Sequence, residues 1–229
     1  GVPRLANFPY GEVSWTKKTS YLVKHGMEGV ISWEDATTNN VDVIARTLLR
    51  IGRAVAKSVD TNIWNILTEN QTPSLINTVA VGVGSEWDSA TVANRDPIKN
   101  ILDSIRAIQE VNYDPLTGRG YLILNPKNYT NLISNSKVTS NPSFKTADVV
   151  SNGKVGQICG LTILVSNTIT ADKAAVVIGQ ECGTWKEAKP LSVATIEDVG
   201  IKYTIRAWEV GVCQLTNPEA VCLITNTDA

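Results

Sequence analysis

The sequence is short of the residue types on which most enzyme active sites depend. Its 229 residues include one histidine and one methionine, and its four cysteines form no C-x-x-C pair. A Ser-His-Asp or Cys-His device would have to use His25, which the pattern places in a turn with no orienting carboxylate beyond Glu28. Gly82-Val83-Gly84 lacks the rest of a nucleotide-binding fingerprint, and the sequence contains no P-loop. We therefore predict a protein without catalytic turnover, bound cofactor or metal.

A large net charge and a long apolar run are also missing. The formal net charge is −1, so no global field would recruit nucleic acid or an anionic membrane to the whole chain. No apolar stretch approaches the ~20 residues that a membrane helix needs, and no signal peptide is visible. The chain begins with Gly1 instead of Met, which indicates either processing or a trimmed start. With 43% hydrophobic residues, it has material for one large or two small domains.

The cysteines are predicted to be free thiols. They are Cys159, Cys182, Cys213 and Cys222. The last two flank Asn217-Pro218 symmetrically, so a hairpin around that turn would place them side by side on adjacent strands. We expect two small buried apolar side chains there, not a metal or redox site.

The residues before the first helix indicate extended structure. Residues 1–11 contain two prolines and two glycines without any period, and are interpreted as an arm. Residues 12–23 alternate in polarity as a strand does, and residues 30–33 form a second short strand. The segment between them, residues 24–29, contains two glycines and is predicted to be a turn.

The strongest pattern is a helix predicted to run from about Asn40 to Asn70. Asn40 is a suitable N-cap, and Asp42 suits the first turn. At 1.5 Å per residue such a helix is roughly 40 Å long, which is long for an ordinary globular domain and favours a structural spine. Its apolar residues recur every three or four positions: Ile44, Leu48, Ile51, Val55, Val59, Ile63 and Ile66.

A second stripe on the same helix is basic. Its members are Arg46, Arg50, Arg53 and Lys57. Three interpretations stay open at this point: a solvated face, ion pairs to a neighbouring subunit, and a surface that touches a packaged polyanion. Two pairs of adjacent carboxylates, Glu34-Asp35 before the helix and Glu197-Asp198 before a later strand, are assigned structural or interface roles.

The remaining segments mix strands and helices. A strand is predicted at residues 78–83, and a helix follows Asp96-Pro97, with proline at its favoured first position. Further strands are expected at residues 160–166, 174–178, 201–215 and 220–224. The third of these changes its apolar phase near Trp208-Glu209, which predicts a bulge, and the fourth is expected to return beside it. Because helices and strands do not alternate strictly, the order favours an α+β fold over a doubly wound parallel sheet.

The stretch YLILNPKNYTNLI joins a predicted strand to a short helix. The turn pair Asn125-Pro126 lies between the two patterns. Neither Ser nor Cys occupies that turn, so it is not a nucleophile elbow. The stretch is predicted to be a corner that packs a strand onto a helix.

Four segments resemble, in family order, the Hong Kong 97-type major capsid proteins of tailed double-stranded DNA viruses. Residues 16–67 resemble the strand pair and spine helix of that family, and residues 121–133 its strand, Asn-Pro turn and helix. Residues 160–180 are similar to its Gly-Leu strand and the following strand that ends in Gly. Residues 192–224 are similar to its closing segment, with Glu-Asp, a long strand and a Pro-Glu-Ala turn.

The resemblance implies a Hong Kong 97-like capsid fold with a peripheral domain, an axial domain and a short N-terminal arm with an extended loop. Residues 1–40 would form the arm and the extended-loop strands. Residues 41–83 would carry the spine helix of the peripheral domain, residues 84–185 the axial domain, and residues 186–229 the long strands of the peripheral domain.

The resemblance also implies a function and partners. The chain would be a structural subunit that assembles in the host cytoplasm into the icosahedral virion capsid, built of pentamers and hexamers around double-stranded DNA. Portal and cement or decoration proteins would be further partners, the DNA would be bound non-specifically, and no membrane would be involved. Expected inter-subunit contacts are Phe8, Tyr10, Arg46, Arg50, Arg53 and Lys57.

Two other functions remain open on the sequence alone. An encapsulin-type nanocompartment shell, which encloses cargo enzymes instead of a genome, is implied by the same resemblance. An enzyme with a cleft in the axial domain is the alternative from another class. Particle size and nucleic-acid content distinguish the virus capsid, the encapsulin-type shell and the enzyme.

Overall fold

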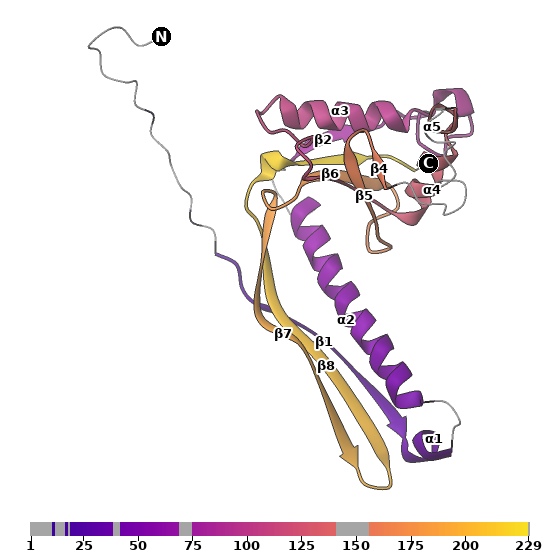
Figure 1. The fold of residues 1–229 in the computed structure, drawn as a ribbon, viewed down its shortest axis with the longest axis vertical. Helices are drawn as coiled ribbons and strands as arrows, with labels where there is room; N and C mark the ends of the chain where they lie inside the picture. Colours follow the sequence, from indigo (N-terminus) through magenta and orange to yellow (C-terminus); the bar gives the residue numbers. More distant parts are fainter. Residues whose placement is uncertain are drawn as a thin grey trace.

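The molecule has a rounded head and a long blade, and helix α2 (Val43–Thr68) and the long strands β7 (Gly183–Asp198) and β8 (Lys202–Leu215) lead from one to the other (Figure 1). The computed structural model describes residues 11, 17, 19–38, 42–68, 75–140 and 156–228. We call residues 23–38, 42–62 and 183–215 the blade, and residues 75–140, 156–178 and 218–228 the head. The elements mix helices with parallel and antiparallel strands, so the predicted α+β class is confirmed.

The blade is a three-stranded antiparallel sheet covered on one face by a helix. Its strand order is β1 (Val23–Ser32), β8 (Lys202–Leu215) and β7 (Gly183–Asp198). Helix α1 (Trp33–Thr38) follows β1, and helix α2 (Val43–Thr68) then runs along β1 and β8 (Figure 1). Alternate side chains of the two strands face α2 and form a small core with it: Ile31, Ile205, Ala207, Ile51 and Val55.

Helix α2 confirms the predicted spine, with two differences of detail. Its N-cap is Asp42, whose Oδ1 accepts a hydrogen bond from the Ala45 amide at 2.9 Å, whereas Asn40 lies outside the described residues. Leu48, predicted to be buried, is 36% exposed, because three strands give too narrow a cover for the whole apolar stripe. Among the described residues, no helix combines the length and apolarity that a membrane crossing requires.

The head contains a mixed six-stranded sheet and the larger core. The strand order is β2 (Asn77–Ala80), β9 (Val221–Thr225), β6 (Lys173–Ile178), β3 (Gly120–Leu124), β5 (Leu161–Val165) and β4 (Gln157–Ile158). Helix α3 (Pro97–Gln109), capped by Asp96, packs on β2, β9 and β6. The last turns of α2 add Trp64 and Leu67 to this core, so one helix takes part in both cores.

Short helical segments complete the head. They are the 3-10 turns Val92–Asn94 and Pro218–Ala220 and the helices α4 (Pro126–Ser134) and α5 (Ser136–Thr139). Residues 221–225, which the predicted domain division assigned to the long-strand segment, pair with β6 of the 84–185 segment, and residues 77–80, assigned to the spine segment, pair with residues 222–225 in the same sheet.

The predicted strand-turn-helix corner is confirmed as β3, Asn125 and α4. The Asn125 side chain accepts from the Lys127 amide at 3.0 Å and donates to the Ile169 carbonyl at 2.7 Å. Asn128, one turn later, is fully buried and donates to the Ala171 carbonyl at 2.8 Å and to Thr227 Oγ1 at 2.9 Å. The corner therefore also fixes the C-terminal residues to the head.

The predicted turn at residues 24–29 is wrong, because β1 passes through it without interruption. The glycine there serves close packing and not chain reversal: a Cβ at Gly29 would lie 2.8 Å from Ile51 Cδ1 of α2. His25 is accordingly a buried strand residue, with Nδ1 2.9 Å from Ser58 Oγ of α2. Residue 33 begins α1 instead of ending a strand, and most of the strand predicted at residues 12–23 lies outside the described residues.

Strand β7 was not predicted, and the predicted bulge belongs to it. β8 pairs with β1 in unbroken register, while the register of β7 shifts on both sides of Lys189, opposite Trp208 and Val210. Pro190 lies within this irregular stretch, where no ladder hydrogen bond is required of it. β7 is an edge strand and mostly exposed, so it has no apolar alternation to reveal it in the sequence.

The predicted β8–β9 hairpin is also wrong. Cys213 pairs with Trp185 of β7, and Cys222 lies between Asn77 of β2 and Val176 of β6, in the other sheet. The 3-10 turn at residues 218–220 leads the chain from the blade into the head instead of reversing it. All four cysteines are nevertheless free thiols, as predicted.

The two cysteines give a pH-dependent prediction. Burial raises the pKa of Cys213, which also lies near Cys182, and that of Cys222, each from 9.0 to about 11. At pH 8 their thiolate fraction is then about 100-fold below that of an ordinary thiol, so both should react slowly with a disulfide reagent and faster as pH rises. The denatured, unreduced chain should titrate as four thiols. Two thiols would contradict the assignment.

A second prediction tests the blade core. Val55→Asp should destabilise the unassembled subunit by about 4 kcal/mol, because it places an unpaired carboxylate in the apolar contact with β1 and β8. Ala56→Asp adds the same charge at the next, exposed position of α2 and should cost less than about 1 kcal/mol. Urea unfolding followed by circular dichroism measures both. Equal losses would mean that the helix faces are wrongly assigned.

Candidate assembly surfaces

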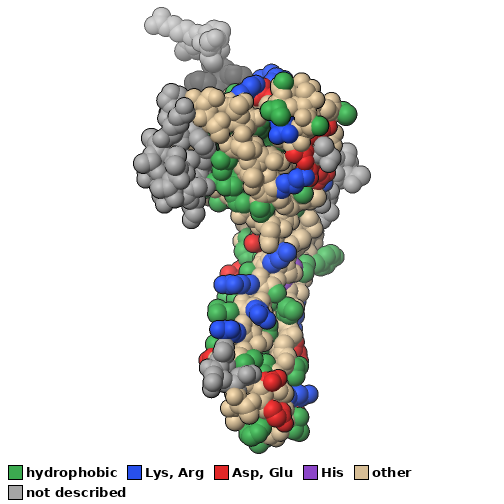
Figure 2. All heavy atoms as spheres, turned by 90° about the vertical axis from the view of Figure 1, so that its right-hand side faces the viewer, with side chains coloured by type: hydrophobic (Ala, Val, Ile, Leu, Met, Phe, Trp, Pro, Cys, Tyr) green, Lys and Arg blue, Asp and Glu red, His purple; other side chains and the backbone are tan. Residues whose placement is uncertain are grey.

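The basic stripe lies on the solvent side of α2, away from the sheet. Its four side chains are exposed, and none forms an ion pair with another described residue. They occupy positions 46, 50, 53 and 57, so the stripe extends over three helical turns, about 16 Å. Figure 2 shows basic side chains along this side of the blade. The stripe is therefore preformed and available to a partner. Phe8 and Tyr10 lie outside the described residues.

An exposed apolar residue accompanies the basic stripe. Leu49, three residues after Arg46 and four before Arg53, lies next to the stripe on the helix surface and is 61% exposed. Burial of this exposed leucine against a protein partner would be favourable, and arginine is enriched in protein contact surfaces.

The blade ends in a tip that the sequence did not reveal as one surface. We call residues 33–35 of α1 and residues 197–201 of the β7–β8 turn the blade tip. The Trp33 amide donates to the Ile201 carbonyl at 3.0 Å, which joins the two segments. All four carboxylates noted in the sequence are exposed here, and Figure 2 shows acidic side chains at the lower end of the blade. Val199 is 84% exposed among them.

One of the tip carboxylates is oriented by a neighbouring side chain. The Tyr203 hydroxyl donates to Glu197 Oε1 at 3.0 Å. This hydrogen bond to the carboxylate raises the pKa of Tyr203. The side chains of Glu34, Asp35 and Asp198 form no ion pair with another described residue.

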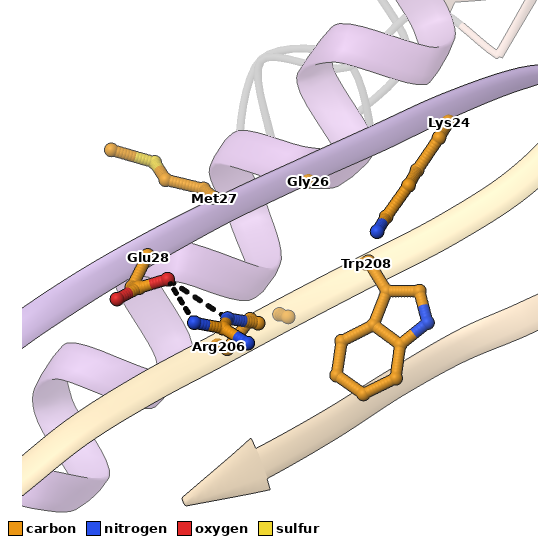
Figure 3. Close-up of a pocket in the computed structure, with 7 residues that line it drawn as sticks. Lys24, Gly26, Met27, Glu28, Arg206 and Trp208 are labelled. Atoms are coloured by element: carbon orange, nitrogen blue, oxygen red, sulfur yellow. Dashed lines mark hydrogen bonds and ion pairs between the residues drawn. The ribbon is translucent and has the colours of Figure 1, made fainter. Parts of the chain in front are cut away.

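The sheet face opposite α2 is open and carries a shallow hollow of about 300 Å³ over Gly26 (Figure 3). On the rim of the hollow, Arg206 forms an ion pair with Glu28, and its Nε and Nη2 atoms each lie 2.8 Å from Glu28 Oε2. The half-buried ring of Trp208 forms another side, and Lys189 lies 4.9 Å from its centroid. The lining contains no nucleophile with an adjacent base.

Metal chemistry has no visible support in the described ranges. They contain no group of three or more His, Cys, Asp or Glu side chains that could hold a metal ion. His25, the single histidine, forms a hydrogen bond through Nδ1 with Ser58 Oγ on α2, and its Nε2 lies 3.4 Å from Asn62 Nδ2 on the same helix. It therefore links β1 to the spine.

The comparisons with known proteins agree on one class. A family model described as phage capsid protein matches residues 16–224, and the chain belongs to this family. Its role is that of a major structural protein of a capsid. A comparison with curated proteins finds no match.

Solved capsid structures share the fold. A structure from Mycobacterium phage Che8 is 17% identical over 90% of this chain and 72% of its own, with a TM-score of 0.70. The capsid of cyanophage P-SCSP1u is 14% identical, with a TM-score of 0.67. The match covers 98% of this chain and 81% of the cyanophage chain. A virus-like particle from Pyrococcus furiosus is 18% identical, with a TM-score of 0.62. The match covers 90% of this chain and 77% of the Pyrococcus furiosus chain.

Proposed function

We propose that copies of this chain form pentamers and hexamers that close into an icosahedral shell around double-stranded viral DNA. The observation that carries the proposal is the shape of the subunit: an elongated blade with exposed charged and apolar surfaces at its side and tip, connected to a rounded head. Such a subunit offers several separate contact surfaces, which a closed symmetric assembly requires. The chain itself has no turnover in this proposal.

The proposed division of the subunit into a peripheral and an axial unit follows its two hydrophobic cores. The spine helix and long strands form a peripheral unit, residues 84–185 form most of an axial unit, and the N-terminal residues form an arm and extended loop. DNA is enclosed without sequence recognition, and portal and cement proteins join the shell in the host cytoplasm. The Arg46, Arg50, Arg53 and Lys57 side chains, together with Phe8 and Tyr10, are proposed as inter-subunit contacts.

Particle size and content test this function. The purified chain should sediment as a particle far larger than its 24.7 kDa mass, with five- and six-fold clusters visible by electron microscopy. Particles from infected cells should have a high ratio of absorbance at 260 to 280 nm because they contain DNA. Particles that contain an enzyme and no nucleic acid would instead indicate the encapsulin alternative, which the Pyrococcus furiosus likeness keeps open. A monomer at high concentration would contradict both.

The arm gives a separate prediction. Deletion of residues 1–11 should leave the circular dichroism of the subunit unchanged while lowering shell yield or heat resistance. The reason is that Val2, Leu5, Phe8 and Tyr10 are proposed to be buried on a neighbouring subunit, at about 25 cal/mol per Å² less the cost of ordering the arm. A full-length variant with these four residues changed to Ser should reproduce the loss. Unchanged shells, or an unfolded subunit, would contradict the proposal.

A further inference from the structure

The basic stripe and the blade tip are complementary in charge. The stripe carries four cations at fixed helical spacing, and the tip carries four carboxylates on two joined segments. Within the described chain these two sets form no ion pair with each other. In a chain with a net charge of −1, this separation of opposite charges onto two surfaces provides attraction between copies without a large field around either one.

The two surfaces are also complementary in their apolar residues. Leu49 lies beside the stripe and is 61% exposed, while Val199 and Ile201 project from the tip, 84% and 60% exposed. A polyanion such as nucleic acid would satisfy the cations but would leave Leu49 in water. A protein surface with carboxylates around apolar side chains satisfies both groups, and the blade tip of a second copy is such a surface.

We propose that the blade tip of one copy docks on the basic stripe of the next copy. Because the two surfaces are different patches of one chain, the contact is heterologous, and each copy has one surface of each kind left for a further neighbour. Repetition with rotation closes a ring or network. This inference rests on the proposed shell function and specifies which surfaces of the subunits meet.

Salt sensitivity follows from the exposure of both surfaces. Charges in contact with solvent attract each other within about 8 Å at physiological ionic strength, and less at higher salt. Assembly yield should therefore fall as salt is raised, and it should fall less in a variant in which the charges of both surfaces are removed.

Charge reversal tests the pairing. Arg50→Glu with Arg53→Glu reverses the centre of the stripe, and Glu34→Arg with Asp35→Arg reverses half of the tip. Each double variant should lower the yield of sedimenting particles by about tenfold or more, because like charges then face each other. The quadruple variant, with both surfaces reversed, should regain most of the wild-type yield. Thermal unfolding of unassembled subunits checks that each variant folds.

The matched control is Arg119→Glu with Lys186→Glu. Both side chains are exposed, and both lie outside the stripe and the tip. This variant and the reversed stripe each move the formal net charge from −1 to −5. Control particles should form at wild-type yield. Loss of assembly in the control would show that total charge governs yield, and would overturn the proposal.

The remaining outcomes are distinct. If the quadruple variant folds but does not recover, the tip is not the partner of the stripe, while the proposed shell function stands. If the reversed stripe assembles normally and loses only packaged DNA, the stripe contacts nucleic acid and the proposal is overturned. A wild-type chain that forms no particle would contradict the shell function itself, and the pairing with it.

Discussion

The structure depends on the packing of α2 against β1 and β8. That contact contains few fully buried side chains, chiefly Ile51 and Val55 of the helix against Ile205 and Ala207 of the strand. The close approach requires Gly29, where any Cβ would collide with Ile51. Without this packing the three-stranded sheet would have no covered face, and its apolar side chains would be exposed to water. Every surface feature of the blade is therefore positioned by one narrow core.

The same helix connects the blade to the head, because Trp64 and Leu67 near its end are part of the larger core. A helix that is anchored in two cores cannot turn about its axis without disrupting both. The basic side chains consequently keep a fixed direction relative to the six-stranded sheet. The blade tip is fixed in the same way, through the Trp33–Ile201 hydrogen bond. A contact made at the tip of one subunit thus determines the orientation of its head.

Features with a local physical cause were predictable from the sequence, and features created by pairing were not. The 3.6-residue period predicted α2 and its basic stripe, and Asn125-Pro126 predicted the corner to α4. The glycines in β1 suggested a turn because their role, close approach to a helix, depends on tertiary contact. β7 has little periodicity because it is an edge strand. The acidic tip was invisible because Glu34 and Glu197 are distant in sequence and meet only through strand register.

The edge of the blade restricts how copies can associate. β7 is one of the two edge strands of its sheet, and a regular exposed edge invites strand pairing with another chain. Its register shifts beside Lys189, and Pro190 there offers no amide hydrogen, so a long uninterrupted ladder with a second copy is blocked. With strand pairing at the β7 edge disfavoured, association on that side of the blade depends on side-chain contacts, as proposed for the stripe and the tip. Such contacts are individually weak and reversible, which lets misplaced subunits dissociate before a shell closes, while repetition makes the closed shell stable.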